Sequence, residues 1–172
     1  DAAAAEPAAA PAAGLCLLAG LATTPPTHPV FRLPVVALNW LQPTLSAGFE
    51  QLALHPKTRD GATPEREAAL ALAREVNSSN AMAVCKAFYR QLDFPTEAEV
   101  RRVAERVPVV LMAGADDQLV PPSETVALKA WLGPQTPLHL VGEASHQLMQ
   151  EEPKAVCAHL AAFLAGPALR AR

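Results

Sequence analysis

The stretch VPVVLMAGADDQLVPP, residues 107–122, joins an apolar, β-branched run to two adjacent carboxylates and then to a pair of prolines. Short continuous apolar runs of this kind are typical of strands buried in a parallel sheet, so we predict a strand that ends at Gly114. Asp116 and Asp117 follow at its carboxyl end, where α/β proteins place their ligands. Acids in such turns are also common as solvated or capping residues. The remaining sequence must therefore distinguish between these two roles.

The sequence after this stretch alternates between helix and strand patterns. SETVALKAWLG (123–133) predicts a helix ended by Gly133, and TPLHLVG (136–142) predicts a second strand. EEPKAVCAHLAAFLAG (151–166) predicts a closing helix with a proline near its first turn. Strand, helix, strand and helix in this order imply right-handed crossovers in a parallel sheet. We therefore expect an α/β fold.

The first half of the chain combines one strand pattern with a long helical pattern. GLCLLAGLATTPP (14–26) predicts another buried strand, and residues 1–13 form an Ala/Pro segment that we expect to be flexible. Residues 29–105 are rich in helix formers, with Thr63 and Thr96 as expected N-caps. Prolines interrupt this region, so we expect several short helices. These prolines are Pro34, Pro43, Pro56, Pro64 and Pro95.

The segment LPVVALNWLQPTLSAGFEQLAL (33–54) is more apolar than one short helix requires. We expect these side chains to pack onto another surface, and such packing is more common for them than contact with a substrate. They are Val35, Val36, Leu38, Trp40, Leu41, Leu45, Phe49 and Leu52.

Length and composition limit the class of protein. The chain has 172 residues, of which 51% are hydrophobic, and this favours one globular domain over a disordered chain. Its net charge is −3 without a basic block, so we do not expect nucleic acid or an anionic membrane surface as a partner. No apolar run approaches the ~20 residues of a transmembrane segment. Cys16, Cys85 and Cys157 are widely spaced, so we expect buried, unpaired thiols in a reducing, intracellular compartment.

Asp117 and His146 are the candidate site residues. They stand 29 positions apart, a spacing that holds one loop, one helix and one strand. Because both predicted strand-to-helix loops leave the carboxyl edge of the same sheet, the two side chains should come close enough for a hydrogen bond. A carboxylate that orients an imidazole is two thirds of a Ser-His-Asp system.

The last third of the chain resembles the C-terminal end of an α/β-hydrolase. The resemblance rests on VPVVLMAGADDQLVPP and on LHLVGEASHQLMQEEPKAVCAHLAAFL. It implies Asp117, three residues after Gly114, as the triad acid, His146 as the base, and Asp116 as a solvated neighbour. It also implies that residues 14–172 form the C-terminal portion of one such domain. The first predicted strand would be the sixth of that fold, and residues 29–105 would be its helical lid or cap.

The family's G-x-S-x-G nucleophile elbow occurs nowhere in this sequence. The serines Ser46, Ser78, Ser79, Ser123 and Ser145 lack its strand-to-helix context. The N-terminal half of the domain would therefore have to supply the nucleophile, and this chain alone should be inactive. The resemblance implies a parent enzyme that hydrolyses an ester, lipid or similar acyl substrate. The alternative is a non-catalytic, truncated or diverged relative that serves as a binding or interaction module.

No cofactor or metal site is expected. A metal bound by Asp116, Asp117 and His146 is conceivable, but no further ligand cluster accompanies them. The other histidines lie outside the two loops, and we expect them to be packing or surface residues. They are His28, His55, His139 and His159.

Overall fold

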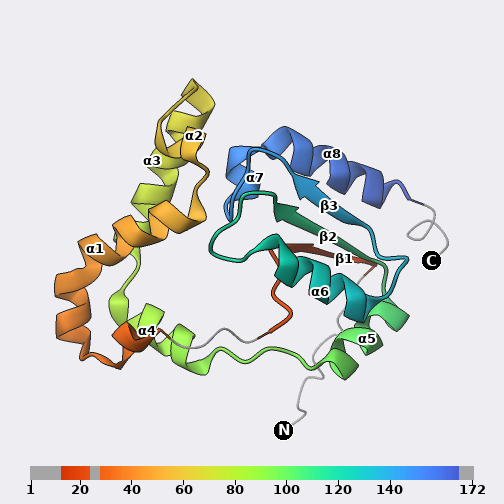
Figure 1. The fold of residues 1–172 in the computed structure, drawn as a ribbon, viewed down its shortest axis with the longest axis horizontal. Helices are drawn as coiled ribbons and strands as arrows, with labels where there is room; N and C mark the ends of the chain where they lie inside the picture. The colour runs from red at the N-terminus through yellow and green to blue at the C-terminus, as the bar shows by residue number, and fades with distance from the viewer. Residues whose placement is uncertain (1–12, 24–27, 167–172) are drawn as a thin grey trace, which may run out of the picture.

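The computed structural model describes residues 13–23 and 28–166, so most of the expected Ala/Pro segment (1–13) lies outside the described residues. Three parallel strands form one sheet in the order β1-β2-β3 (Figure 1). The strands are β1 (Leu15–Leu18), β2 (Val109–Gly114) and β3 (Leu138–Val141). All three lie within the runs that predict strands, and the α/β class is confirmed.

The helices fall into two groups along the chain. In order, they are η1 (Pro29–Arg32), α1 (Val35–Ala53), α2 (Pro56–Arg59), α3 (Pro64–Ser79), α4 (Met82–Gln91), α5 (Glu97–Arg106), α6 (Pro122–Leu132), α7 (Leu148–Glu151) and α8 (Pro153–Leu164). We call η1 to α4, residues 29–91, the helical segment. The last four helices lie beside the sheet (Figure 1).

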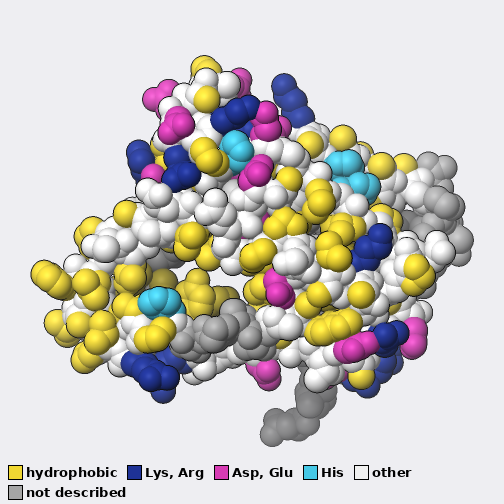
Figure 2. Space-filling model, viewed as in Figure 1, with side chains coloured by type: hydrophobic (Ala, Val, Ile, Leu, Met, Phe, Trp, Pro, Cys, Tyr) yellow, Lys and Arg dark blue, Asp and Glu magenta, His cyan; other side chains and the backbone are white. Residues whose placement is uncertain are grey.

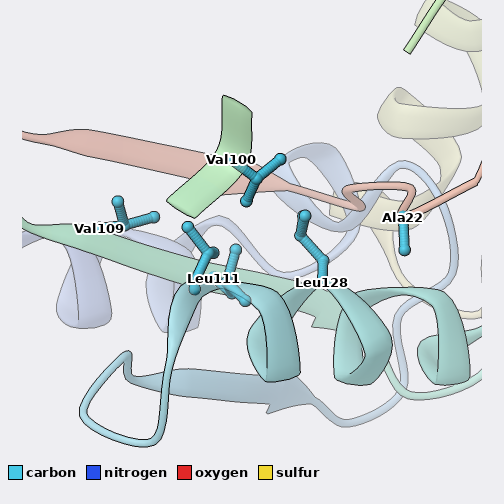
Figure 3. Close-up of a cluster of buried hydrophobic side chains, with 6 residues drawn as sticks. Ala22, Val100, Val109, Leu111 and Leu128 are labelled. Carbon is cyan, nitrogen blue, oxygen red and sulfur yellow. The ribbon is translucent and has the colours of Figure 1, made fainter. Parts of the chain in front are cut away.

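The core lies on both faces of β2, because successive strand residues point to opposite faces. On one face, Val109 and Leu111 pack with Val100 of α5 and Leu128 of α6 (Figure 3), and Trp131 packs against this cluster. The other face packs against α8 and the loop before α7; its buried members are Val110, Met112, Val141, Ala144, Leu148 and Val156. The six residues of β2 are all buried, whereas β1 is only partly buried.

Local sequence signals account for several helix ends. Thr63 accepts a hydrogen bond from Arg66 N at the start of α3, as expected for an N-cap. Thr96 and Glu99 form a capping box at the start of α5. Gly133 ends α6 with a φ of 103°, a conformation that favours glycine. These three signals were readable from the sequence and are confirmed.

Pro43 was expected to interrupt the helical region, and that expectation is wrong. It lies inside α1, which continues for 19 residues. Proline removes the N–H that would bond to the carbonyl four residues earlier, here Asn39. Both residues are exposed and border an open groove of about 430 Å³, so solvent can reach the freed carbonyl.

The expected packing of the apolar α1 side chains is found only in part: Leu38 is buried, and Leu41, Leu45 and Phe49 are partly buried. Only Leu38 and Ala53 of this helix are buried. Val36 and Trp40 are 81% and 82% exposed. Figure 2 shows hydrophobic side chains gathered over α1 at the left of the view. The helical segment thus has little core of its own.

Polar contacts connect the helical segment to the end of the sheet. Arg66 of α3 is a buried residue whose guanidinium donates to Thr58 Oγ1 (2.8 Å) and to the carbonyl oxygen of Glu143 (3.0 Å). The same guanidinium pairs with the carboxylate of Glu152, between α7 and α8. Because a buried cation is tolerated only when it is paired and hydrogen-bonded, these partners fix where α3 lies.

The cysteines are free, but the expectation of burial is not met. Cys157 is exposed, and Cys16 and Cys85 are partly buried. Burial raises the pKa of the Cys16 thiol, which favours its neutral form. Cys157 is exposed because it lies on a face of α8 other than the one where Val156 and Leu160 pack against the sheet.

His139 of β3 and His159 of α8 stack with ring centroids 3.9 Å apart, as packing residues rather than site residues. Burial, and then the charge of His159, lower the pKa of His139 from its ordinary value of 6.5. The folded chain therefore binds this proton less readily than the unfolded chain does. As the pH falls below about 6.5, protonation favours unfolding, and stability decreases.

We predict that His159→Gln reduces this loss of stability, because it removes the neighbouring charge. Urea unfolding at pH 7.5 and at pH 5.5 would measure the decrease in the free energy of unfolding in both proteins. His28→Gln, at the N-cap of η1, is the control and should retain the loss seen in the unaltered chain. An equal loss in the His159→Gln variant would contradict the coupling between the two rings.

Candidate functional site

Two loops meet at the carboxyl edge of the sheet. The acid loop (residues 115–121) follows β2, and the histidine loop (142–147) follows β3. Backbone hydrogen bonds join the acid loop to the end of β3 and to the histidine loop: Ala115 N donates to Val141 O (2.8 Å), and Asp116 N donates to Ala144 O (3.0 Å). The pairing of the two parallel strands therefore continues into the loops and fixes their relative position.

Gly114, the last residue of β2, permits a close approach of the two loops. A Cβ atom built on Gly114 would lie 2.1 Å from the carbonyl oxygen of Ser145 and 2.6 Å from that of Ala144. Both atoms belong to the backbone, so no flexible side chain could move aside. Any residue larger than glycine would push the histidine loop away from the acid loop.

Asp117 lies in the acid loop with its carboxylate fully buried. Its Oδ1 accepts hydrogen bonds from the backbone N–H groups of Leu119 (2.9 Å) and Val120 (2.8 Å). Its Oδ2 lies 3.0 Å from Nδ1 of His146. One oxygen thus closes the turn, the ordinary role of an aspartate there, and the other faces the imidazole.

His146 is partly exposed, with 26% of its side chain accessible. Because a carboxylate can only accept, its contact with Asp117 places the ring proton on Nδ1. In the neutral ring, Nε2 then carries the lone pair. Nε2 has no hydrogen-bond partner within the described part of the chain, so this nitrogen is the one that can accept a proton from another group.

Asp116 does not take part in the pair with His146. Its carboxylate is 54% exposed, and its Oδ2 lies 3.5 Å from Nε2 of His55. The two adjacent acids therefore have different partners. The sequence did not identify His55 as a site residue, because it lies 61 positions before Asp116 in the helical region and no local pattern connects them.

Glu151 in α7 is a second residue that sequence reasoning missed. It is buried, and its carboxylate accepts hydrogen bonds from the backbone N–H groups of Ser145 and His55, both at 2.6 Å. Glutamate is seldom buried, so the residue type alone predicts a surface position for Glu151. The proline two residues later marks a helix start but says nothing of this role.

Other candidate groups lie elsewhere. Ser145 precedes His146, but its hydroxyl donates to the carbonyl oxygen of Leu52 (3.2 Å). Among residues 13–23 and 28–166, no three His, Cys, Asp or Glu side chains are arranged to hold a metal ion. In the same residues, no helix is both long and apolar enough to cross a membrane.

Two cavities border the helical segment, and neither is lined by Asp117 or His146. One of about 430 Å³ lies between α1 and α3, and the residues that line it include Gln42, Glu50 and Arg74. The other, of about 40 Å³, lies beside Phe49 and Gln147. Neither of these two cavities is therefore a substrate pocket at His146.

Two solved structures that resemble this chain are hydrolases. A thermophilic esterase from Thermogutta terrifontis, solved with malate bound, gives a TM-score of 0.65 at 18% identity over 88% of this chain and 55% of its own. MGS-M2, an α/β-hydrolase enzyme from a Medee basin deep-sea metagenome library, gives 0.61 at 16% identity over 89% and 56%. No protein-family model matches the sequence, and no curated protein matches it. The chain has part of the α/β-hydrolase fold and spans about half the length of these structures.

We predict that Gly114→Ala lowers the free energy of unfolding by about 2 kcal/mol or more, because the new methyl group overlaps the backbone of the histidine loop. Urea denaturation of the 172-residue chain would measure the change. Gly142→Ala is the matched control, since a Cβ at Gly142 meets no atom within 4 Å. Similar effects of the two substitutions would contradict the close approach.

Proposed function

We propose that this chain supplies the acid and the base of the catalytic triad of a serine-type α/β-hydrolase that acts on an ester, lipid or similar acyl substrate. The observation that carries the proposal is the 3.0 Å contact between Asp117 Oδ2 and His146 Nδ1. The resemblance of the fold to an esterase and to a second α/β-hydrolase supports it.

In this proposal, His146 is the general base. Its Nε2 takes the proton from a serine hydroxyl during attack on the acyl carbon and later returns it to the leaving group. Asp117 keeps the ring proton on Nδ1, which leaves Nε2 free to accept, and stabilises the imidazolium that forms. The buried position of Asp117 strengthens this interaction, because less water screens the two charges.

The serine belongs to the N-terminal half of the domain, which is also the proposed partner of β1. Within the described residues, β1 pairs with β2 along one edge only, so its other edge presents free backbone donors and acceptors. The solved hydrolases are nearly twice as long as the part that this chain matches. A nucleophile strand on the β1 side would place the elbow at the same carboxyl edge as His146.

The helical segment is the proposed lid, and its exposed apolar side chains suit an acyl or lipid substrate. Val36 and Trp40 of α1 and Val84 and Phe88 of α4 are all exposed in this chain. Substrate pockets are mostly apolar, and such a lid would supply one wall. We limit the proposed lid to residues 29–91, rather than the 29–105 expected from the sequence, since Val100 of α5 packs in the core beside β2.

We predict that His146→Ala and Asp117→Asn each lower turnover of p-nitrophenyl esters by about 10⁴-fold or more. The measurement requires a longer protein that contains this chain together with a G-x-S-x-G elbow. Asp93→Asn, an exposed carboxylate between α4 and α5, is the control and should leave turnover unchanged. The 172-residue chain alone should show no turnover.

Unchanged turnover in the His146→Ala variant would contradict the role of His146 as the general base. The alternative, a non-catalytic binding module, would then be favoured. It would also be favoured if the 172-residue chain were a monodisperse monomer that unfolds cooperatively, because a cut enzyme with an open β1 edge should self-associate. Size-exclusion chromatography with light scattering distinguishes these two outcomes.

A further inference from the structure

Glu151 is a buried charge without a counter-ion in the described part of the chain, where none of the ion pairs includes it. Burying a carboxylate is costly unless hydrogen bonds replace its water. Here the backbone N–H groups of Ser145 and His55 replace it, one on each oxygen and each at 2.6 Å. Hydrogen bonds to a charged acceptor are about twice as strong as neutral ones. The carboxylate therefore holds these two backbone segments at a fixed separation.

The two segments are the histidine loop and the end of α1. We call Leu52 to His55 the α1–α2 junction. Ser145 Oγ donates to Leu52 O (3.2 Å), and Gln147 N donates to Ala53 O (3.3 Å). Both chain neighbours of His146 are thus bonded to the same junction, and Glu151 adds a third connection. The position of the His146 backbone depends on where the junction lies.

His55 also reaches the acid loop through its side chain. Its Nδ1 accepts the N–H of Lys57 (3.2 Å), so the proton of the neutral ring is on Nε2. Nε2 lies 3.5 Å from Oδ2 of Asp116, and the His55 ring is only 12% exposed. At this distance the contact is electrostatic rather than a short hydrogen bond. One residue of the junction therefore contacts both loops, by its backbone through Glu151 and by its ring through Asp116.

We propose that Glu151 and His55 are positioning residues that set the geometry of the Asp117–His146 pair from the α1–α2 junction. The inference rests on the proposed function, in which the helical segment covers the site. It deepens that function, because a shift of the helical segment would move the base relative to its acid. Neither residue touches the reacting atoms, and both act through the loops that they hold.

The test uses proton NMR of the 172-residue chain, where a His146 Nδ1 proton bonded to a carboxylate is observed at low field. Glu151→Gln keeps the size of the side chain but replaces one acceptor oxygen with an amide donor. We expect exchange of the Nδ1 proton with water to accelerate by about tenfold or more, since a hydrogen bond to a charged group is lost. Glu50→Gln, which breaks the Glu50–Arg74 pair within the helical segment, is the control and should leave the exchange rate unchanged.

Two variants of His55 distinguish the contact that its ring makes with Asp116 from the hydrogen bond that its backbone N–H donates to Glu151. His55→Ala removes the ring but retains the N–H that donates to Glu151. His55→Pro removes both, and the backbone accommodates it, because φ at residue 55 is −62° and Leu54 is extended. We expect faster exchange in both variants and the larger increase in His55→Pro. These variants decide the question if Glu151→Gln does not fold, as judged from the amide spectrum.

The outcomes distinguish this inference from the proposed function. A low-field proton in the unaltered chain, with exchange within twofold of that rate in all three variants, would overturn the positioning role and leave the acid–base pair intact. Absence of the proton in the unaltered chain would overturn both. In the longer enzyme with the elbow, the inference further requires Glu151→Gln to lower kcat by about tenfold with KM unchanged, since positioning affects the reaction and not substrate binding.

Discussion

The approach of two backbones at the end of β2 is the constraint on which the site depends. Parallel pairing of β2 and β3 brings both loops to one edge, and Gly114 lets the carbonyl groups of Ala144 and Ser145 lie where a side chain would otherwise be. The backbone hydrogen bonds between the loops follow from this contact. Only with the loops at this separation can the short side chain of Asp117 reach the His146 ring.

Much of this arrangement could be predicted from the sequence. The apolar runs and the caps at Thr63, Thr96 and Gly133 are local signals, and they located the strands and three helix ends. The pairing of Asp117 with His146 followed from chain order, because each side chain lies in the loop that follows a strand of the same sheet. These signals need no knowledge of how distant segments pack.

The sequence was silent where distant segments meet. His55 and Glu151 are 96 positions apart and have no pattern that links them. Pro43 led to a wrong prediction of a helix break. At this exposed position water can hydrogen-bond to the carbonyl that the proline leaves without a partner, whereas in a buried helix that carbonyl would stay unsatisfied. Trp40 also led to a wrong prediction. Its apolar side chain predicted packing against another surface, but it is exposed in the described part of the chain. Each of these depends on surroundings that the chain order does not encode.

The helical segment and the sheet differ in how much apolar core stabilises them. Each of the two contains one tryptophan in the described residues, and the surroundings of these tryptophans reflect the difference. Trp40 is exposed on α1, whereas Trp131 packs against the cluster formed by β2, α5 and α6. The segment has a small apolar core and connects to the sheet end through the buried Arg66. An indole in water emits at longer wavelengths than a packed one. The fluorescence of this chain therefore contains two separable reporters: a red-shifted component from the exposed Trp40 of α1, and a blue-shifted component from Trp131 that follows the packing of the sheet.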